Sequence, residues 1–197
     1  MTRRADGSRL DNFISSRSAL VLAFAWGLAE ATVFFIVPDV LLTLYGCRKL
    51  KPAINATVAA LIGALAGGVL AYSFGYRDPD AARAFLAHIP AISPALISRV
   101  ADQITDNGLA AVLLGPLKGI PYKLYAVEWG ARREGLISLM LISVPARYVR
   151  FFLATLAARL IARFLTPLTE HRARKELAIL AVLWIAFYGF YFSRFGW

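Results

Sequence analysis

The sequence is short of cysteine, histidine and charge, and each shortage excludes a class of site. Cys47 is the only cysteine among 197 residues, so an intrachain disulfide or a cysteine cluster cannot form. The two histidines, His88 and His171, have no partner at metal-ligand spacing, and no Ser-His-Asp set is able to converge. We therefore expect no metal, no cofactor and no enzymatic activity.

Apolar residues dominate what is present. They make up 59% of the chain against 17% charged residues, and the mean hydropathy is +0.61. This composition is typical of an integral membrane protein rather than of a soluble domain. A spanning helix needs about 20 predominantly apolar residues, and three stretches meet that need, at about residues 53–75, 136–165 and 177–193. We predict an all-α polytopic membrane protein with a single membrane domain over residues 18–193.

Two further apolar stretches, about residues 18–46 and 108–130, are interrupted by charge, glycine and proline. The interrupting residues are Glu30, Pro38 and Asp39 in the first stretch, and Gly115, Pro116, Lys118, Gly119, Pro121 and Lys123 in the second. Apolar segments that are broken at corresponding places in two halves point to a membrane binding site. We predict that both stretches are re-entrant helical hairpins that enter from opposite faces.

The basic residues are dispersed at the ends of the apolar stretches, with no nucleic-acid-binding motif among them. The net charge of +10 is therefore better explained by the positive-inside rule. With both hairpins in place, most loop arginines and lysines share one face with the N-terminus. We predict a multi-pass protein of the plasma (inner) membrane with a cytoplasmic N-terminus, a basic interfacial arm at residues 1–17 and an amphipathic surface connection at residues 76–107. Glu30 interrupts the first apolar stretch, so a cleaved secretory signal is not expected.

Several charged residues fall inside the apolar stretches, where each unpaired charge costs about 2.5–3.5 kcal/mol at the centre of a spanning helix. Arg147 and Arg150 have i, i+3 spacing, which places both on one face of a helix. The full set comprises four bases, Lys118, Lys123, Arg147 and Arg150, and three acids, Glu30, Asp39 and Glu128. A site with this balance is net positive, and we expect it to bind an anion. The alternative is that these residues are structural ion pairs that fix how the hairpins pack.

The arrangement of these motifs resembles the DedA family, the bacterial branch of the VTT-domain (SNARE-associated) membrane proteins. The likeness covers roughly residues 19 to 193. The matching positions are Glu30, Pro38-Asp39 and Gly46 in the first hairpin, Gly67, Tyr72 and Gly75 in the next helix, and Lys118, Gly119, Pro121, Lys123 and Gly130 in the second hairpin. Lysines replace the usual arginines of that hairpin, and Gly68 replaces a common acid. The chain therefore resembles a divergent member of the family.

The resemblance implies facing re-entrant hairpins and the translocation of lipids, such as polyprenyl phosphate or other phospholipids. It predicts a flippase or scramblase whose partners are membrane lipids with phosphate head-groups. Glu30 and Asp39, with Glu128, become candidates for proton coupling or charge pairing. The residues expected to bind the substrate are Lys118, Lys123, Arg147, Arg150, Gly119 and Pro121.

Two other functions remain open from the sequence. A proton-coupled transporter of a small solute would use the same hairpins and carboxylates. A non-transporting membrane scaffold would use the buried charges only as structural pairs. The sequence is also compatible with a homo-oligomer.

Overall fold

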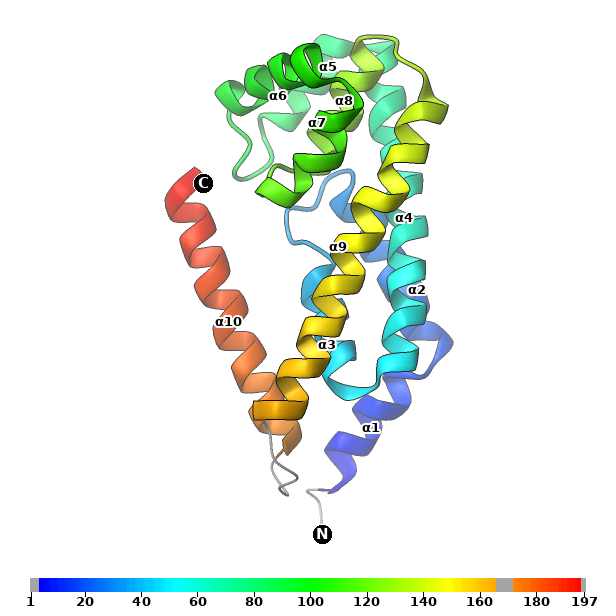
Figure 1. The fold of residues 1–197 in the computed structure, drawn as a ribbon, viewed down its shortest axis with the longest axis vertical. Helices are drawn as coiled ribbons and strands as arrows, with labels where there is room; N and C mark the ends of the chain where they lie inside the picture. Colours follow the sequence, from blue (N-terminus) through cyan, green and yellow to red (C-terminus); the bar gives the residue numbers. More distant parts are fainter. Residues whose placement is uncertain (1–3, 166–171, 196–197) are drawn as a thin grey trace.

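The computed structural model describes residues 4–165 and 172–195, and all regular structure within these ranges is helical (Figure 1). This confirms the predicted all-α fold. In chain order the elements are α1 (Arg4–Ile14), α2 (Arg17–Glu30), α3 (Asp39–Arg48), α4 (Leu50–Arg77), α5 (Pro79–Leu86), α6 (Pro94–Asn107), α7 (Leu109–Leu114), the 3-10 turn η1 (Pro116–Lys118), α8 (Tyr122–Ala131), α9 (Leu136–Leu165) and α10 (Arg172–Phe195).

Three helices are long and apolar enough to cross a membrane, as predicted. They are α4, the Leu136–Phe164 part of α9 and the Lys175–Ser193 part of α10. They differ in how far the protein surrounds them, because 44% of the apolar window of α4 is buried inside the molecule but only 6% of that of α10. In Figure 1, α4 and α9 run side by side over most of the height, and α10 diverges from them. The first two helices form the centre of the fold, and α10 forms an outer wall.

Each interrupted stretch forms two short helices joined by a break. The first break, residues 31–38, separates α2 from α3, and the second, which contains Gly119, separates η1 from α8. Gly119 has a φ of +84°, a left-handed conformation that glycine adopts without steric cost. The 14 residues of α2 extend about 21 Å and the 10 residues of α8 about 15 Å. Both helices are shorter than the roughly 30 Å of a hydrocarbon core.

The short helices pack on α4 through glycines that allow backbones to touch. A methyl group at Gly63 would stand 2.0 Å from the carbonyl oxygen of Phe24 in α2, and one at Gly75 would stand 2.1 Å from that of Val127 in α8. Small residues allow this approach where helices meet in a membrane. The first part of α4 therefore holds α2, and the last part holds α8.

The other two short helices lie along α9. A methyl group at Gly46 of α3 would stand 2.6 Å from the carbonyl oxygen of Thr155, and α7 contacts the first part of α9. The Thr155 hydroxyl also lies 3.2 Å from the Thr57 hydroxyl and links α9 to α4. As a result the two breaks lie close together, on the side of α9 that faces α10 (Figure 1).

The 76–107 connection forms α5 and α6, which sit at the end of the molecule opposite α1 (Figure 1). The apolar face of α6, with Leu96, Val100 and Ile104, is buried against the rest of the fold. Pro94 and the Ser93 side chain, which accepts a hydrogen bond from the Leu96 N–H, start this helix. The amphipathic connection is thus a helical cap over α7 and α8.

We expect Gly63→Ala to lower the midpoint of thermal unfolding in detergent, because the added methyl group collides with the backbone of α2. Overpacking of this kind costs roughly 1–3 kcal/mol. The matched control is Gly189→Ala in α10, where nothing lies within 4 Å of an added methyl group. An unchanged midpoint for Gly63→Ala would contradict the close packing of α2 on α4.

Candidate functional site

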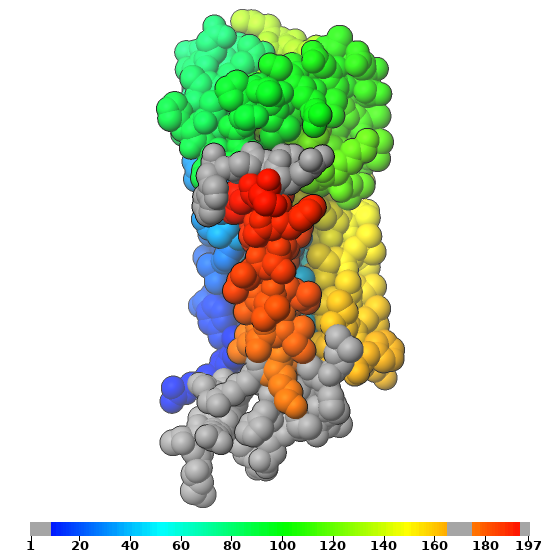
Figure 2. Space-filling model, turned by 90° about the vertical axis from the view of Figure 1, so that its left-hand side faces the viewer, coloured from blue at the N-terminus to red at the C-terminus, as the bar shows by residue number. Residues whose placement is uncertain are grey.

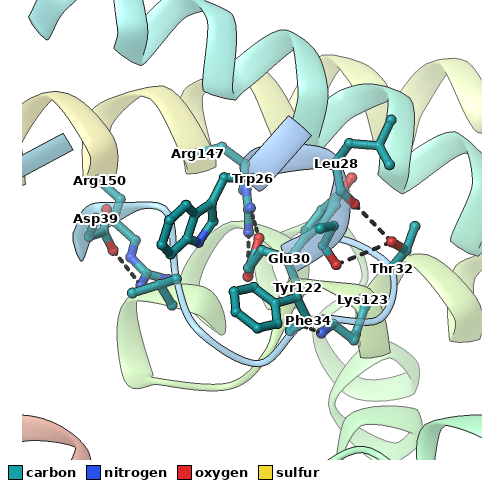
Figure 3. Close-up of polar contacts among 12 residues, drawn as sticks. Trp26, Leu28, Glu30, Thr32, Phe34, Asp39, Tyr122, Lys123, Arg147 and Arg150 are labelled. Carbon is teal, nitrogen blue, oxygen red and sulfur yellow. Dashed lines mark hydrogen bonds and ion pairs between the residues drawn. The ribbon is translucent and has the colours of Figure 1, made fainter. Parts of the chain in front are cut away.

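The centre of the site is a buried ion pair between Glu30, the last residue of α2, and Arg147, from the middle of α9 (Figure 3). The guanidinium Nη2 donates to Oε2 of Glu30, and Nη1 lies 3.4 Å from Oε1. The two residues are only 4% and 1% exposed. Arg147 also lies over the rings of Tyr122 and Phe151, at 4.8 and 5.0 Å from their centroids. Its charge is compensated by a carboxylate on one side and by aromatic faces on others.

A second ion pair lies about one turn further along α9. Nη2 of Arg150 donates to Oδ2 of Asp39 at 2.6 Å, and Asp39 is the first residue of α3 (Figure 3). The i, i+3 spacing of the two arginines therefore places both on the face that meets the first break, as predicted. The side chain of Arg150 remains 23% exposed, whereas Arg147 is enclosed. Arg150 is the arginine that an incoming ligand could reach.

Lys123 brings a third base from the opposite break. Its Nζ donates to the backbone carbonyl oxygen of Phe34 at 2.7 Å, and the residue is only 2% exposed (Figure 3). Within the described ranges no salt bridge to Lys123 is found, so a neutral oxygen is its hydrogen-bond acceptor. Three bases therefore face two acids, and the cluster has a net charge of +1 with all five groups ionised.

A small cavity of about 50 Å³ adjoins these charges and has room for a few water molecules. Glu30, Lys123 and Arg150 line it, together with Gly119 and Pro121 from the second break. Its outer wall is α10, which lies across this face of the molecule in Figure 2. The cavity brings residues from both breaks and from α9 into one space.

Two tyrosines of α10 close the cavity. The Tyr188 hydroxyl accepts a hydrogen bond from the Val37 N–H at 2.9 Å, and the Tyr191 hydroxyl lies 3.5 Å from the Gly119 carbonyl oxygen. No motif in the sequence indicated that these two tyrosines contact the breaks. Their spacing of three residues places both tyrosines on one helix face, but nothing in the sequence says which face turns inward.

The prediction that Lys118 lies among the buried bases is wrong, because this residue is exposed. It ends the 3-10 turn η1, and the left-handed Gly119 that follows reverses the chain toward α8. Lys123, five residues later, is the lysine that reaches the centre of the fold. Gly119 and Pro121, also expected at the site, do line its cavity.

Glu128 is buried as expected, but it belongs to a different ion pair. Both of its carboxylate oxygens accept hydrogen bonds from Arg83 of α5, at 2.7 and 2.8 Å. These bonds raise the pKa of Arg83 above its ordinary value. The pair fastens the cap to α8. It could not be foreseen from the sequence, because Arg83 lies in the long connection. The structure thus places three bases and two acids in the cluster, where four bases and three acids were predicted. The net charge of the cluster is positive in both cases.

Two buried polar atoms of the cluster have no hydrogen-bond partner among the described residues, Oδ1 of Asp39 and Nε of Arg147. Buried polar groups are nearly always paired with protein or ordered water. The cluster therefore has unused hydrogen-bonding capacity at Asp39 and Arg147.

No family model, curated protein or solved structure matches this chain. The function has to be argued from the chemistry of the site.

Removal of one partner of the buried pair should destabilise the protein strongly. We expect Arg147→Met to cost about 3–5 kcal/mol, because Glu30 is left as an uncompensated buried charge. The double variant Glu30→Gln with Arg147→Met should recover part of that loss. The measurement is thermal unfolding of the detergent-solubilised protein, with Lys118→Met as the control that removes an exposed charge. Equal losses for Arg147→Met and Lys118→Met would contradict the assignment.

Proposed function

We propose that the protein translocates an anionic lipid across the membrane, as a flippase or scramblase for a lipid with a phosphate head-group. The observation that carries the proposal is the net-positive cluster of Lys123, Arg147 and Arg150 beside a cavity between the two breaks. Charged residues inside a membrane protein mark a substrate pathway or an ion pathway in most cases.

The lengths of the short helices support a re-entrant arrangement. Neither α2 with 14 residues nor α8 with 10 reaches the 17–25 residues of a typical spanning helix. Two hairpins that dip in from opposite faces would bring their breaks to the middle of the bilayer. The DedA-like pattern of the sequence implies the same arrangement.

The ends of two short helices favour an anion at this place. Both α3 and α8 begin at a break, and neither has a side-chain cap on its first N–H groups. Free N–H groups and the positive end of the helix dipole attract negative charge. Together with Lys123 and Arg150, these two helix ends form the proposed seat for the phosphate.

The carboxylates supply a way to couple binding to protons. Asp39 competes with a phosphate for the guanidinium of Arg150, since both are anions that accept charge-assisted hydrogen bonds from it. Protonation of Asp39 would release Arg150 to the head-group, and deprotonation would displace the head-group again. Glu30 and Arg147 form the corresponding pair one turn away. Lys118, exposed in η1, is not part of this seat.

Access to the seat requires movement of α10. The cavity of about 50 Å³ is far below the roughly 300–1000 Å³ of ligand pockets. The outer wall of the cavity is α10, the least enclosed of the three spanning helices. The contacts of Tyr188 with Val37 and of Tyr191 with Gly119 hold this helix over the seat. We infer that α10 swings outward and opens the cavity sideways to the bilayer.

One observation favours a second function, a membrane scaffold without transport. Four acids are buried among the described residues, and each has an arginine partner, as structural ion pairs would require: Glu30, Asp39, Glu128 and Glu176. A scaffold has no need of Lys123 beside a cavity, and we rank it second for that reason. A proton-coupled transporter of a small solute would be distinguished by solute uptake without lipid movement.

The test is leaflet exchange of a labelled phospholipid and of labelled polyprenyl phosphate in vesicles that contain the purified protein. We expect exchange to be faster than in protein-free vesicles and to respond to the direction of a pH gradient. Arg150→Gln should slow it roughly 10- to 100-fold, because one charge-assisted bond contributes about 1.5–3 kcal/mol. Lys123→Met should have a similar effect.

The control for charge removal is Lys51→Met, an exposed residue in the first turn of α4 at the far end of the molecule, which should leave exchange unchanged. Exchange no faster than in protein-free vesicles, under either gradient, would overturn the proposal. Loss of exchange that only follows loss of folded protein would favour the scaffold.

A further inference from the structure

A second, larger cavity lies between α3, α9 and α10. Its volume is about 320 Å³, within the range of ligand pockets. One wall comes from α9 and includes four alanines, Ala154, Ala157, Ala158 and Ala162. The other comes from apolar residues of α10 that include Ile179 and Leu183. We call this space the tail groove.

The tail groove adjoins the charged seat. Phe187 of α10 lines both cavities, so the apolar space adjoins the one lined by Lys123 and Arg150 at this side chain. The groove also reaches Glu176 near the start of α10, which is paired with Arg48 at 3.2 Å. From Glu176 to Phe187 a helix rises about 16 Å, roughly half of a 30 Å hydrocarbon core. The groove therefore has the length of one leaflet and a cationic seat at its inner end.

Polar contacts hold α10 at a distance from the alanines of α9. The Trp184 indole N–H donates to the Thr43 hydroxyl at 3.0 Å, and the Arg48–Glu176 pair anchors the start of the helix. Alanine side chains are too short to fill the space that remains. The distance between α9 and α10 is thus set by contacts between α3 and α10, and the packing of these helices leaves the groove open.

We propose that the tail groove binds one hydrocarbon chain of the same lipid whose anionic head-group occupies the seat. This rests on the proposed function and adds that the substrate is held by its chain as well as by its head. The occupant is an amphiphile with a phosphate at one end, because only such a molecule matches an apolar groove that continues into a cluster of net positive charge.

The test uses a long-chain alkyl phosphate with a photoreactive diazirine at the end of its chain, added to the full-length protein in nanodiscs of zwitterionic lipid. Mass spectrometry of the cross-linked peptides should find the label on residues 154–162 of α9 and 179–187 of α10. A probe with the same chain and a hydroxyl group in place of the phosphate should label these peptides at least about tenfold less.

Two variants fill the tail groove from the α9 side, Ala157→Phe and Ala154→Phe. Ala157 is exposed and Ala154 is only half-buried, so neither change disturbs a packed core position. Each should reduce groove labelling by the phosphate probe at least about tenfold. The matched control is Leu153→Phe on the same helix, which is 55% exposed and does not line the groove. It should keep the label.

The outcomes separate this inference from the proposed function. Equal labelling by the two probes would mean that bulk lipid enters the groove without regard to charge, and would overturn the inference. Absence of label from both helices would overturn it as well. In either case, lipid exchange by the wild-type protein would leave the proposed function standing. If exchange itself fails, the proposed function falls whether or not the probe labels the groove.

Discussion

The rest of the structure depends on the ion pair between Glu30 and Arg147. A charge alone at the centre of a bilayer costs about 2.5–3.5 kcal/mol, so neither residue is tolerated there without a partner. Glu30 is the last residue of α2 before the first break, so the pair joins this end of α2 to the middle of α9. Tyr122, the first residue of α8, lies against the same guanidinium. Two helices from different halves of the chain thus meet on one arginine, and the cavity forms beside it.

Two long helices support this centre in different ways, α4 through glycine contacts and α9 through ion pairs. Gly63 and Gly75 let α2 and α8 lie directly on the backbone of α4, which leaves no room for either to shift. The polar partners Arg147 and Arg150 come from α9 instead. Helix α4 fixes the positions of α2 and α8, and α9 supplies the arginine that contacts both of them. The most weakly enclosed of the three spanning helices, α10, takes no part in the Glu30–Arg147 and Asp39–Arg150 pairs.

Composition and pattern predicted much of the fold for clear physical reasons. Long apolar runs predict spanning helices because lipid leaves a backbone no other way to satisfy its hydrogen bonds, and α4, α9 and α10 confirm it. The spacing of Arg147 and Arg150 predicted their common face. The sequence could not show which lysine turns inward, since the conformation at Gly119 decides that. It also could not pair Glu128 with Arg83, because that contact depends on how the cap folds back over α8.

The hydrogen bond from Lys123 to the carbonyl oxygen of Phe34 has a mechanical consequence. It crosses directly from the second interrupted unit to the first, at the level where their breaks meet (Figure 3). The bond therefore joins the two units directly at their breaks, in addition to the packing of α2 and α8 on α4. A phosphate oxygen that binds Lys123 would take the place of the carbonyl. In the proposed translocation, arrival of the anion would open this contact between the two units while α2 and α8 stay packed on α4.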